Sequence, residues 1–231
     1  MTGVDALSEE AISLKLNEGK SADDEGDFYL GTCPVITFYK NADPQVIIID
    51  FGNGCEGKDG KIRSGRIIIT SEKFENFTAV RNKTFDNFYV DEKKVEGTVI
   101  KTFTINPEEH IRVAGIEEDI TITFPDNEGT ISRKANLTRR NELKVIGIVR
   151  DNVITSWGIV ELTRLNGVKV TKTIDEATPL VFKASCRRIV SGIVKVTTSD
   201  NRSWTIDYGE GECDNTAVVT NGEITRIIKL R

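Results

Sequence analysis

Turn-forming residues divide this chain into short segments from residue 29 onward, and none of these segments is long enough to serve as a crossover helix. The segments are rich in β-branched and aromatic residues, and turn signals recur roughly every 8–12 residues. Asn-Gly at 166–167 and 221–222 favours tight hairpins, because both residues readily adopt positive φ. Parallel strands need connections of about a dozen or more residues, so the sheet is predicted to be antiparallel.

The pattern as a whole predicts an all-β fold, an antiparallel meander of about 15 strands whose sheet is curved, sandwich-like or barrel-like. Ile120, Ile122 and Phe124 alternate with two threonines, which is typical of a strand with one face in water. The predicted strands are 35–39, 46–51, 66–71, 84–90, 95–105, 119–124, 130–138, 143–149, 153–162, 169–174, 180–183, 189–197, 203–207, 216–219 and 225–230.

The first 30 residues differ in composition from the rest of the chain. They carry eight acidic and two basic residues, a net charge of −6, whereas the whole chain has −5. Residues 1–30 are therefore predicted to be an acidic leader, flexible or partly helical, and 31–231 a nearly neutral β domain. A domain without a positive field does not attract nucleic acid, so that class of partner is excluded.

Two segments of the chain share a cysteine-containing pattern. One begins at Cys33 and ends Ile-Asp-Phe-Gly-Asn-Gly-Cys55, and the other begins at Cys186 and ends Ile-Asp-Tyr-Gly-Glu-Gly-Glu-Cys213. This internal pseudo-repeat favours two disulfides, Cys33–Cys55 and Cys186–Cys213, and therefore predicts export to an oxidising compartment. The alternative is four free, buried thiols in a cytosolic protein.

Both copies of the pattern gather oxygen-bearing side chains next to the second cysteine. Such loops are candidate calcium sites, but their spacing differs from an EF-hand, and Asp and Asn also close turns through their own backbone. Turn structure is the favoured interpretation, and no cofactor other than this calcium is expected. The candidate ligands are Asp50, Asn53 and Asp59 in the first copy and Asp207, Glu210 and Asp214 in the second.

No motif assigns a catalytic residue. The glycines of 52–57 have dinucleotide-site spacing, but a turn and a strand follow them instead of the helix that such a site requires. His110 is the single histidine, and no Gly-x-Ser-x-Gly turn accompanies it. Most aromatic residues are expected in the core, and the candidates for ligand contact are Phe88, Tyr89, Trp157 and Trp204.

Several short sequence segments within residues 33–231 resemble those of a known family. They lie at 33–34, 49–60, 63–65, 85–90, 95–97, 123–126, 178–180, 189–192, 206–215 and 228–231. Together they resemble an uncharacterised family of exported, β-rich lipoproteins from Bacteroidetes. The resemblance implies a lipid-anchored protein of the periplasm or outer-membrane surface, with its lipidated cysteine upstream of residue 1 and the acidic leader as a tether. It implies no activity and no functional residues.

The leading functional hypothesis is a non-enzymatic envelope or surface lipoprotein that binds a glycan or another envelope protein. A carrier of lipid or another apolar ligand is the second hypothesis, and a glycan-acting hydrolase that uses surface carboxylates is the third. The membrane is contacted only through the lipid anchor, because no segment approaches the about 20 apolar residues that span a bilayer.

Overall fold

The computed structural model describes residues 33–73, 75–142 and 153–230, and these residues form an all-β protein as predicted. One 3-10 turn, η1 (Pro125–Asn127), accompanies the strands. Within these residues, no helix has the length and apolar character needed to cross a membrane. The strands are β1 (Val35–Tyr39), β2 (Gln45–Asp50), β3 (Cys55–Glu56), β4 (Ile62–Ser71), β5 (Thr78–Val90), β6 (Lys93–Asn106), β7 (Ile111–Thr123), β8 (Thr130–Glu142), β9 (Val153–Thr163), β10 (Lys169–Ile174), β11 (Leu180–Lys183), β12 (Arg188–Thr198), β13 (Ser203–Glu210), β14 (Thr216–Thr220) and β15 (Thr225–Lys229).

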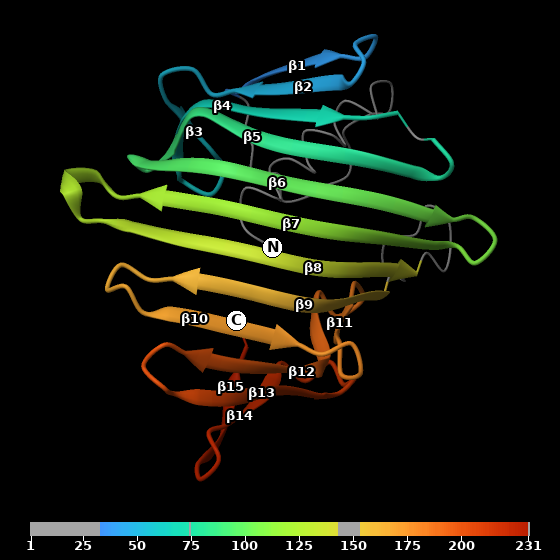
Figure 1. Ribbon diagram of the computed structural model, residues 1–231, viewed down its shortest axis with the longest axis vertical. Coiled ribbons are helices and arrows are strands. Elements are labelled where there is room, and N and C mark those ends of the chain that lie inside the picture. The colour runs from blue at the N-terminus through green and yellow to red at the C-terminus, as the bar shows by residue number, and fades with distance from the viewer. Residues whose placement is uncertain (1–32, 74, 143–152, 231) are drawn as a thin grey trace. The chain divides into compact units, whose positions relative to one another are not determined.

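The strands form one 15-stranded sheet, and its pairings are antiparallel (Figure 1). Its hydrogen-bonded order is β1-β2-β4-β5-β6-β7-β8-β9-β10-β12-β13-β14-β15. The short strand β3 pairs with β4, and β11 pairs with both β9 and β12. Strands that follow one another in sequence are therefore neighbours almost throughout, which is the meander that the short turns predicted.

Most strand boundaries agree with the sequence pattern, and β7 shows why some do not. It begins at Ile111, well before the predicted start at 119. The buried residues in this first part of β7 are Ala114, Ile116 and Glu118. Because one of them is small and another is charged, the sequence there shows no clear alternation of apolar and polar residues. Glu118 is accommodated by an ion pair with Arg133 on β8. The predicted strand 143–149 lies outside the described residues.

The β domain predicted over 31–231 contains two compact units. The first unit comprises 33–73, Val80–Val99 and Ile120–Thr130. The second unit comprises 75–79, Ile100–Asp119 and 131–230.

Buried side chains of β2, β4 and β5 form the core of the first unit. Ile47 is opposite Ile69 and Ile49 is opposite Ile67, and all four side chains are buried. The intervening Ile48 and Ile68 are half-buried, so an unbroken apolar run in the sequence still alternates in burial along the strand. Phe88 is fully buried, and its ring centroid lies 5.6 Å from that of Phe51 and 5.7 Å from that of Phe85.

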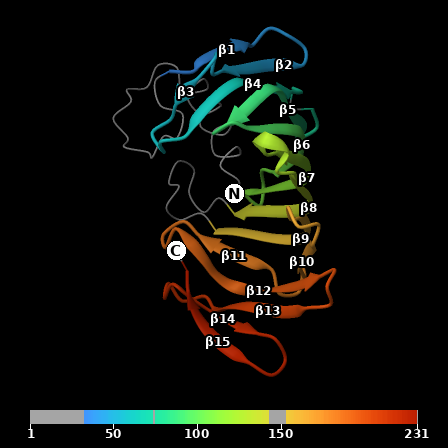
Figure 2. The same ribbon diagram turned by 90° about the vertical axis from the view of Figure 1, so that its left-hand side faces the viewer.

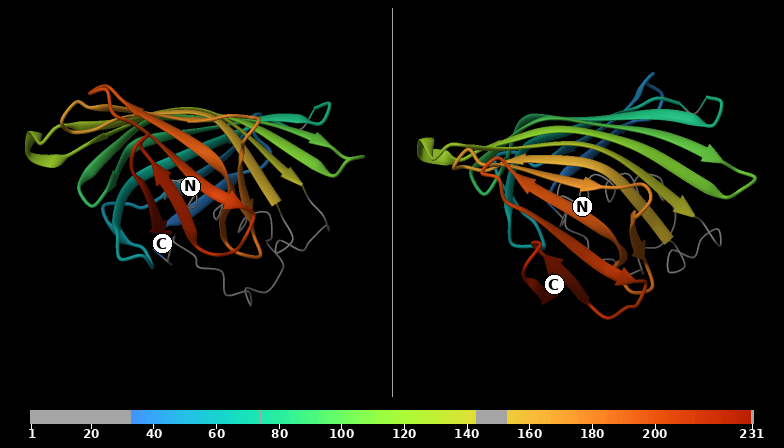
Figure 3. Two further views of the ribbon diagram at one scale, coloured as in Figure 1. Left: turned by 90° about the horizontal axis from the view of Figure 1, so that it is seen from below. Right: turned by 60° about the horizontal axis from the view of Figure 1, so that its bottom comes forward.

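The core of the second unit lies on β10 and β12. It consists of Val170, Ile174, Val194 and Val196, with the rings of Trp157, Trp204 and Tyr208 packed against it. Figure 2 shows the strands β12 to β15 side by side at the C-terminal end of this unit. Figure 3 shows that the strands of this unit, coloured from yellow-orange to dark red, do not all run in the same direction, as expected of a twisted sheet.

Both predicted disulfides are confirmed, one in each unit. Cys33 and Cys55 have their Cα atoms 5.8 Å apart, and Cys186 and Cys213 have theirs 5.7 Å apart. These separations are typical of disulfides, and none of the four cysteines is a free thiol. Such bonds persist in oxidising compartments, which indicates that the protein resides outside the cytoplasm.

Candidate functional site

The two Ile-Asp-aromatic-Gly segments close their turns in the same way. In the first, Asp50 at the end of β2 accepts a hydrogen bond from the backbone N–H of Gly52 through Oδ1, at 2.8 Å. In the second, Oδ1 of Asp207 accepts from the N–H of Gly209 at 2.9 Å. Both glycines have positive φ, 57° and 85°. Each aspartate is therefore an acceptor that stabilises a turn, the interpretation that the sequence favoured.

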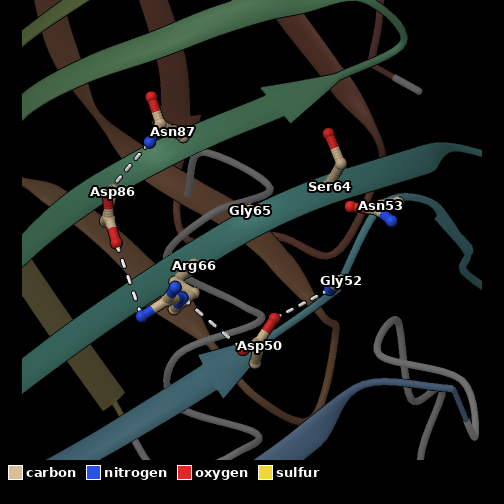
Figure 4. A pocket seen from close by; sticks show the side chains of 8 residues that line it. All are labelled: Asp50, Gly52, Asn53, Ser64, Gly65, Arg66, Asp86 and Asn87. Atoms are coloured by element: carbon tan, nitrogen blue, oxygen red, sulfur yellow. Dashed lines mark hydrogen bonds and ion pairs between the residues drawn. The ribbon is translucent and has the colours of Figure 1, made fainter.

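Asp50 also belongs to a row of charges across three neighbouring strands of the first unit (Figure 4). Asp50 on β2 is opposite Arg66 on β4, and Arg66 is opposite Asp86 on β5. The Arg66 Nε lies 3.5 Å from Asp50 Oδ2, and Nη1 lies 3.7 Å from Asp86 Oδ2. All three side chains are 42–52% exposed, and ion pairs this exposed add at most about 1 kcal/mol to stability. Their charges therefore remain accessible to a ligand.

Gly65 shapes the backbone beside this row. The pairing of β4 with β5 is interrupted by a bulge between Ser64 and Arg66, where Gly65 has φ 76°. Gly65 also joins β4 to the turn after β2, because its N–H donates to the Gly52 carbonyl and its carbonyl accepts from the Phe51 N–H, both at 2.9 Å. The bulge thus fixes the turn against β4.

Together these features form an open pocket of about 410 Å3 in the first unit (Figure 4). The side chains present two carboxylates, one guanidinium, two amides and a hydroxyl, with a net charge of −1. Asn87 donates to Oδ1 of Asp86 at 3.3 Å, which orients both groups. A site with this many donors and acceptors and no exposed ring suits a polar, hydroxyl-rich ligand. The lining residues are Asp50, Gly52, Asn53, Ser64, Gly65, Arg66, Asp86 and Asn87.

Four of the six predicted calcium ligands, Asp50, Asp59, Asp207 and Asp214, form hydrogen bonds or ion pairs with other groups of the protein. Asp50 and Asn53 both line the pocket, but Asp59 forms an ion pair with Arg63 instead. Asp214 accepts from the N–H of Thr216 at 3.1 Å and from its hydroxyl at 2.9 Å, and these bonds lower the pKa of Asp214. Glu210 is exposed at the end of β13. In the part of the chain that the structure describes, no three His, Cys, Asp or Glu side chains converge as metal ligands would.

The four aromatic candidates occupy different environments. The prediction that Phe88 contacts a ligand is wrong, because its side chain is fully buried in the core of the first unit. Tyr89, the next residue on β5, is half-buried. Trp157 and Trp204 cover the core of the second unit, and Trp204 also borders a second hollow, of about 620 Å3.

Arg63 is a charged side chain in the interior of the first unit. It is 3% exposed, and its Nη1 and Nη2 donate to the Asp59 carboxylate at 2.9 Å and 2.7 Å. The Arg63 guanidinium holds the pKa of Asp59 below its ordinary value of 3.8. The Asp59 carboxylate was a calcium candidate in the sequence, and here it neutralises a buried cation.

Replacing Asp59 with asparagine is expected to destabilise the protein by about 2–4 kcal/mol at pH 7, because Arg63 would stay buried without a counter-charge. Urea unfolding measures the loss. The folded pKa of Asp59 is depressed, so its stabilisation is complete above the ordinary value of 3.8 and disappears as the pH falls through the lower folded value. The difference between wild type and Asp59→Asn should therefore shrink in acid.

The control for that variant is Asp43→Asn. Asp43 is 71% exposed and pairs with Lys73 at 3.1 Å, so its loss should change stability by less than about 0.5 kcal/mol. Equal effects of the two substitutions would contradict the role given to Arg63.

The sequence pointed to Asp50 and Asn53 but missed Arg66, Asp86 and Asn87. The signal for Arg66 was present, because it begins the predicted strand 66–71 and faces Asp50 once those strands pair as a hairpin. Asp86 reaches the site only through the bulged register of β4 and β5, which no local pattern encodes.

No protein-family model, curated protein or solved structure matches this chain.

Proposed function

We propose that this protein is a non-enzymatic, lipid-anchored protein of the cell envelope that binds a polar, hydroxyl-rich ligand such as a glycan. The observation that carries the proposal is the open pocket around Asp50, Arg66 and Asp86. The two disulfides support a location outside the cytoplasm. The lipid anchor and the periplasmic or cell-surface location rest on the sequence resemblance to Bacteroidetes lipoproteins.

The pocket offers the groups that hydroxyl-rich ligands need. Carboxylates accept hydrogen bonds from hydroxyls, a guanidinium donates to ring and hydroxyl oxygens, and the amides of Asn53 and Asn87 do both. Hydrogen bonds to the charged groups are the stronger ones. Recognition of a chain of sugars from such an open site would depend on several contacts of this kind.

The same geometry favours binding over hydrolysis. A glycosidase needs two carboxyl groups that flank the scissile bond, separated by about 5–9.5 Å. Here the Arg66 guanidinium lies between Asp50 and Asp86 and is within ion-pair distance of both. It occupies the position that the bond to be cleaved would need.

Asp86→Asn tests this proposal. We expect the wild type to bind members of a panel of bacterial and host glycans, and Asp86→Asn to bind the best of them at least roughly 10-fold more weakly, since hydrogen bonds to charged groups contribute about 1.5–3 kcal/mol. Isothermal titration calorimetry measures both affinities. Asp86 closes no turn, so the variant should unfold like the wild type.

Asp43→Asn provides the matched control, because it makes the same chemical change outside the pocket. It should leave the affinity unchanged. If wild type and Asp86→Asn bound the glycan equally well, the glycan would bind outside this pocket. If the wild type bound no glycan of the panel, glycans would be rejected as the class of ligand.

A further inference from the structure

The last strand of the sheet, β15, has one hydrogen-bonding edge that no strand within the described residues occupies. It pairs only with β14 in the strand order, and all five of its residues are exposed. The N–H of Leu230 donates to the Asn215 carbonyl, and the N–H of Asn221 donates to the Ile224 carbonyl. In an antiparallel pair such bonds recur at every second residue, so the backbone groups of Arg226 face β14. Those of Thr225, Ile227 and Lys229 face outward, where no described strand meets them.

Apolar side chains are also exposed on both faces of this edge. Ile227 is 74% exposed and lies opposite Val218 on β14, which is exposed too. Ile224, on the other face, is 51% exposed. Charged side chains on an edge strand discourage unselective pairing, so Arg226 and Lys229 restrict which strand can add here. Exposed apolar side chains beside unpaired backbone groups indicate an interaction site.

A hollow lies beside β15 on the face that carries Ile224. It measures about 620 Å3, and its lining includes Trp204, Val219, Ile224, Arg202 and Arg226. A strand added to β15 would direct alternate side chains toward this hollow and the others toward Ile227. The hollow thus provides a pocket for every second side chain of the added strand.

The charges of the edge define what fits it. Arg226 and Lys229 make no ion pair with any described residue, and Glu223 in the preceding turn is the one acid of this hairpin. Arg202 is different, because its hydrogen bonds to Asp200 satisfy it and lower the pKa of Asp200 to about 2. The edge therefore presents two uncompensated cations beside two isoleucines.

A second copy of the chain does not complement this edge. Antiparallel pairing of two β15 strands would gather Arg226 and Lys229 of both copies along two strands that hold no acidic residue, and such a concentration of like charge is unfavourable. The strand at the other end of the sheet order, β1, has no acidic residue within Val35–Tyr39 and offers no compensation either.

We propose that β15 is a docking edge for an extended, acidic segment of a partner protein, which adds to the sheet as a further antiparallel or parallel strand. Apolar side chains of that segment cover Ile227 or enter the hollow beside Trp204. Its carboxylates meet Arg226 and Lys229. This site lies in the second unit and is independent of the pocket proposed to bind glycans.

Fluorescence anisotropy with labelled decapeptides on the full chain tests the proposal. A peptide of alternating Val and Glu should bind, more weakly as salt rises, while one of alternating Val and Lys should bind at least 10-fold more weakly. Ile227→Pro removes an outward N–H without removing a bond to β14, and Lys229→Glu reverses a charge. Each should reduce affinity for the Val-Glu peptide by 10-fold or more.

Two variants serve as controls. Lys169→Glu reverses an exposed charge on β10, and Asp86→Asn alters the glycan pocket, so both should bind the Val-Glu peptide like the wild type. Equal binding of the Val-Glu and Val-Lys peptides, or no effect of Ile227→Pro and Lys229→Glu, would overturn the proposal. A dimer in sedimentation experiments that Ile227→Pro dissolves would show that a second copy occupies the edge instead.

Discussion

Gly65→Ala is expected to destabilise the protein by about 4 kcal/mol or more, because a steric clash with the paired strand and an unfavourable backbone conformation act together. A Cβ atom at residue 65 would lie 2.8 Å from the Asp86 carbonyl oxygen and closer still to the carbonyl of Asn87. These are backbone atoms of a paired strand, so they cannot rotate away. The positive φ of 76° adds a conformational penalty of about 1–2 kcal/mol for any residue with a Cβ.

Gly60→Ala separates the two contributions. Gly60 has a similar φ of 70°, but a Cβ there would have no neighbour within 4 Å. Only the conformational penalty applies, so we expect a loss of about 1 kcal/mol. Urea unfolding of both variants at 25 °C measures the difference. If the two losses were equal, the close approach of β4 and β5 at the bulge would be unimportant.

Removal of a disulfide is the second large effect. Replacing Cys33 and Cys55 with serine should destabilise the protein by about 3–4 kcal/mol, because the bond closes a loop of 22 residues in the unfolded chain. Replacing Cys186 and Cys213, which close a loop of 27 residues, should cause a loss of similar size, also about 3–4 kcal/mol. Denaturant unfolding of each double variant measures these losses.

Reduction of the wild type provides the matching experiment. Unfolding in the presence of a phosphine reductant should reproduce the combined loss of the two double variants, and a thiol assay on unreduced, unfolded protein should find no free thiol. Unchanged unfolding midpoints in the variants would contradict the stabilising role. Free thiols in the unreduced protein would remove the support for a location outside the cytoplasm.

The sequence by itself determined the fold class, most of the strands and the disulfide pairing. These properties depend on local signals. Strands β1, β10 and β11 coincide with the predicted ranges, because their flanking turns are marked by residues that suit positive φ or cannot continue a strand. The repeated pattern around Cys55 and Cys213 was enough to choose among the possible pairings. The same pattern also predicted that Asp50 and Asp207 close turns.

Only the tertiary structure decided which residues meet across strands. The bulge at Gly65 shifts the register of β4 against β5, and this shift brings Asp86 beside Arg66. The burial of Arg63, which is 3% exposed beside Asp59, was likewise not evident from residue type, because charged side chains are usually exposed. Register is a relation between distant segments, and a shift of one residue turns every side chain to the opposite face. A local pattern does not specify it, so the strands were predictable and the site that they build was not.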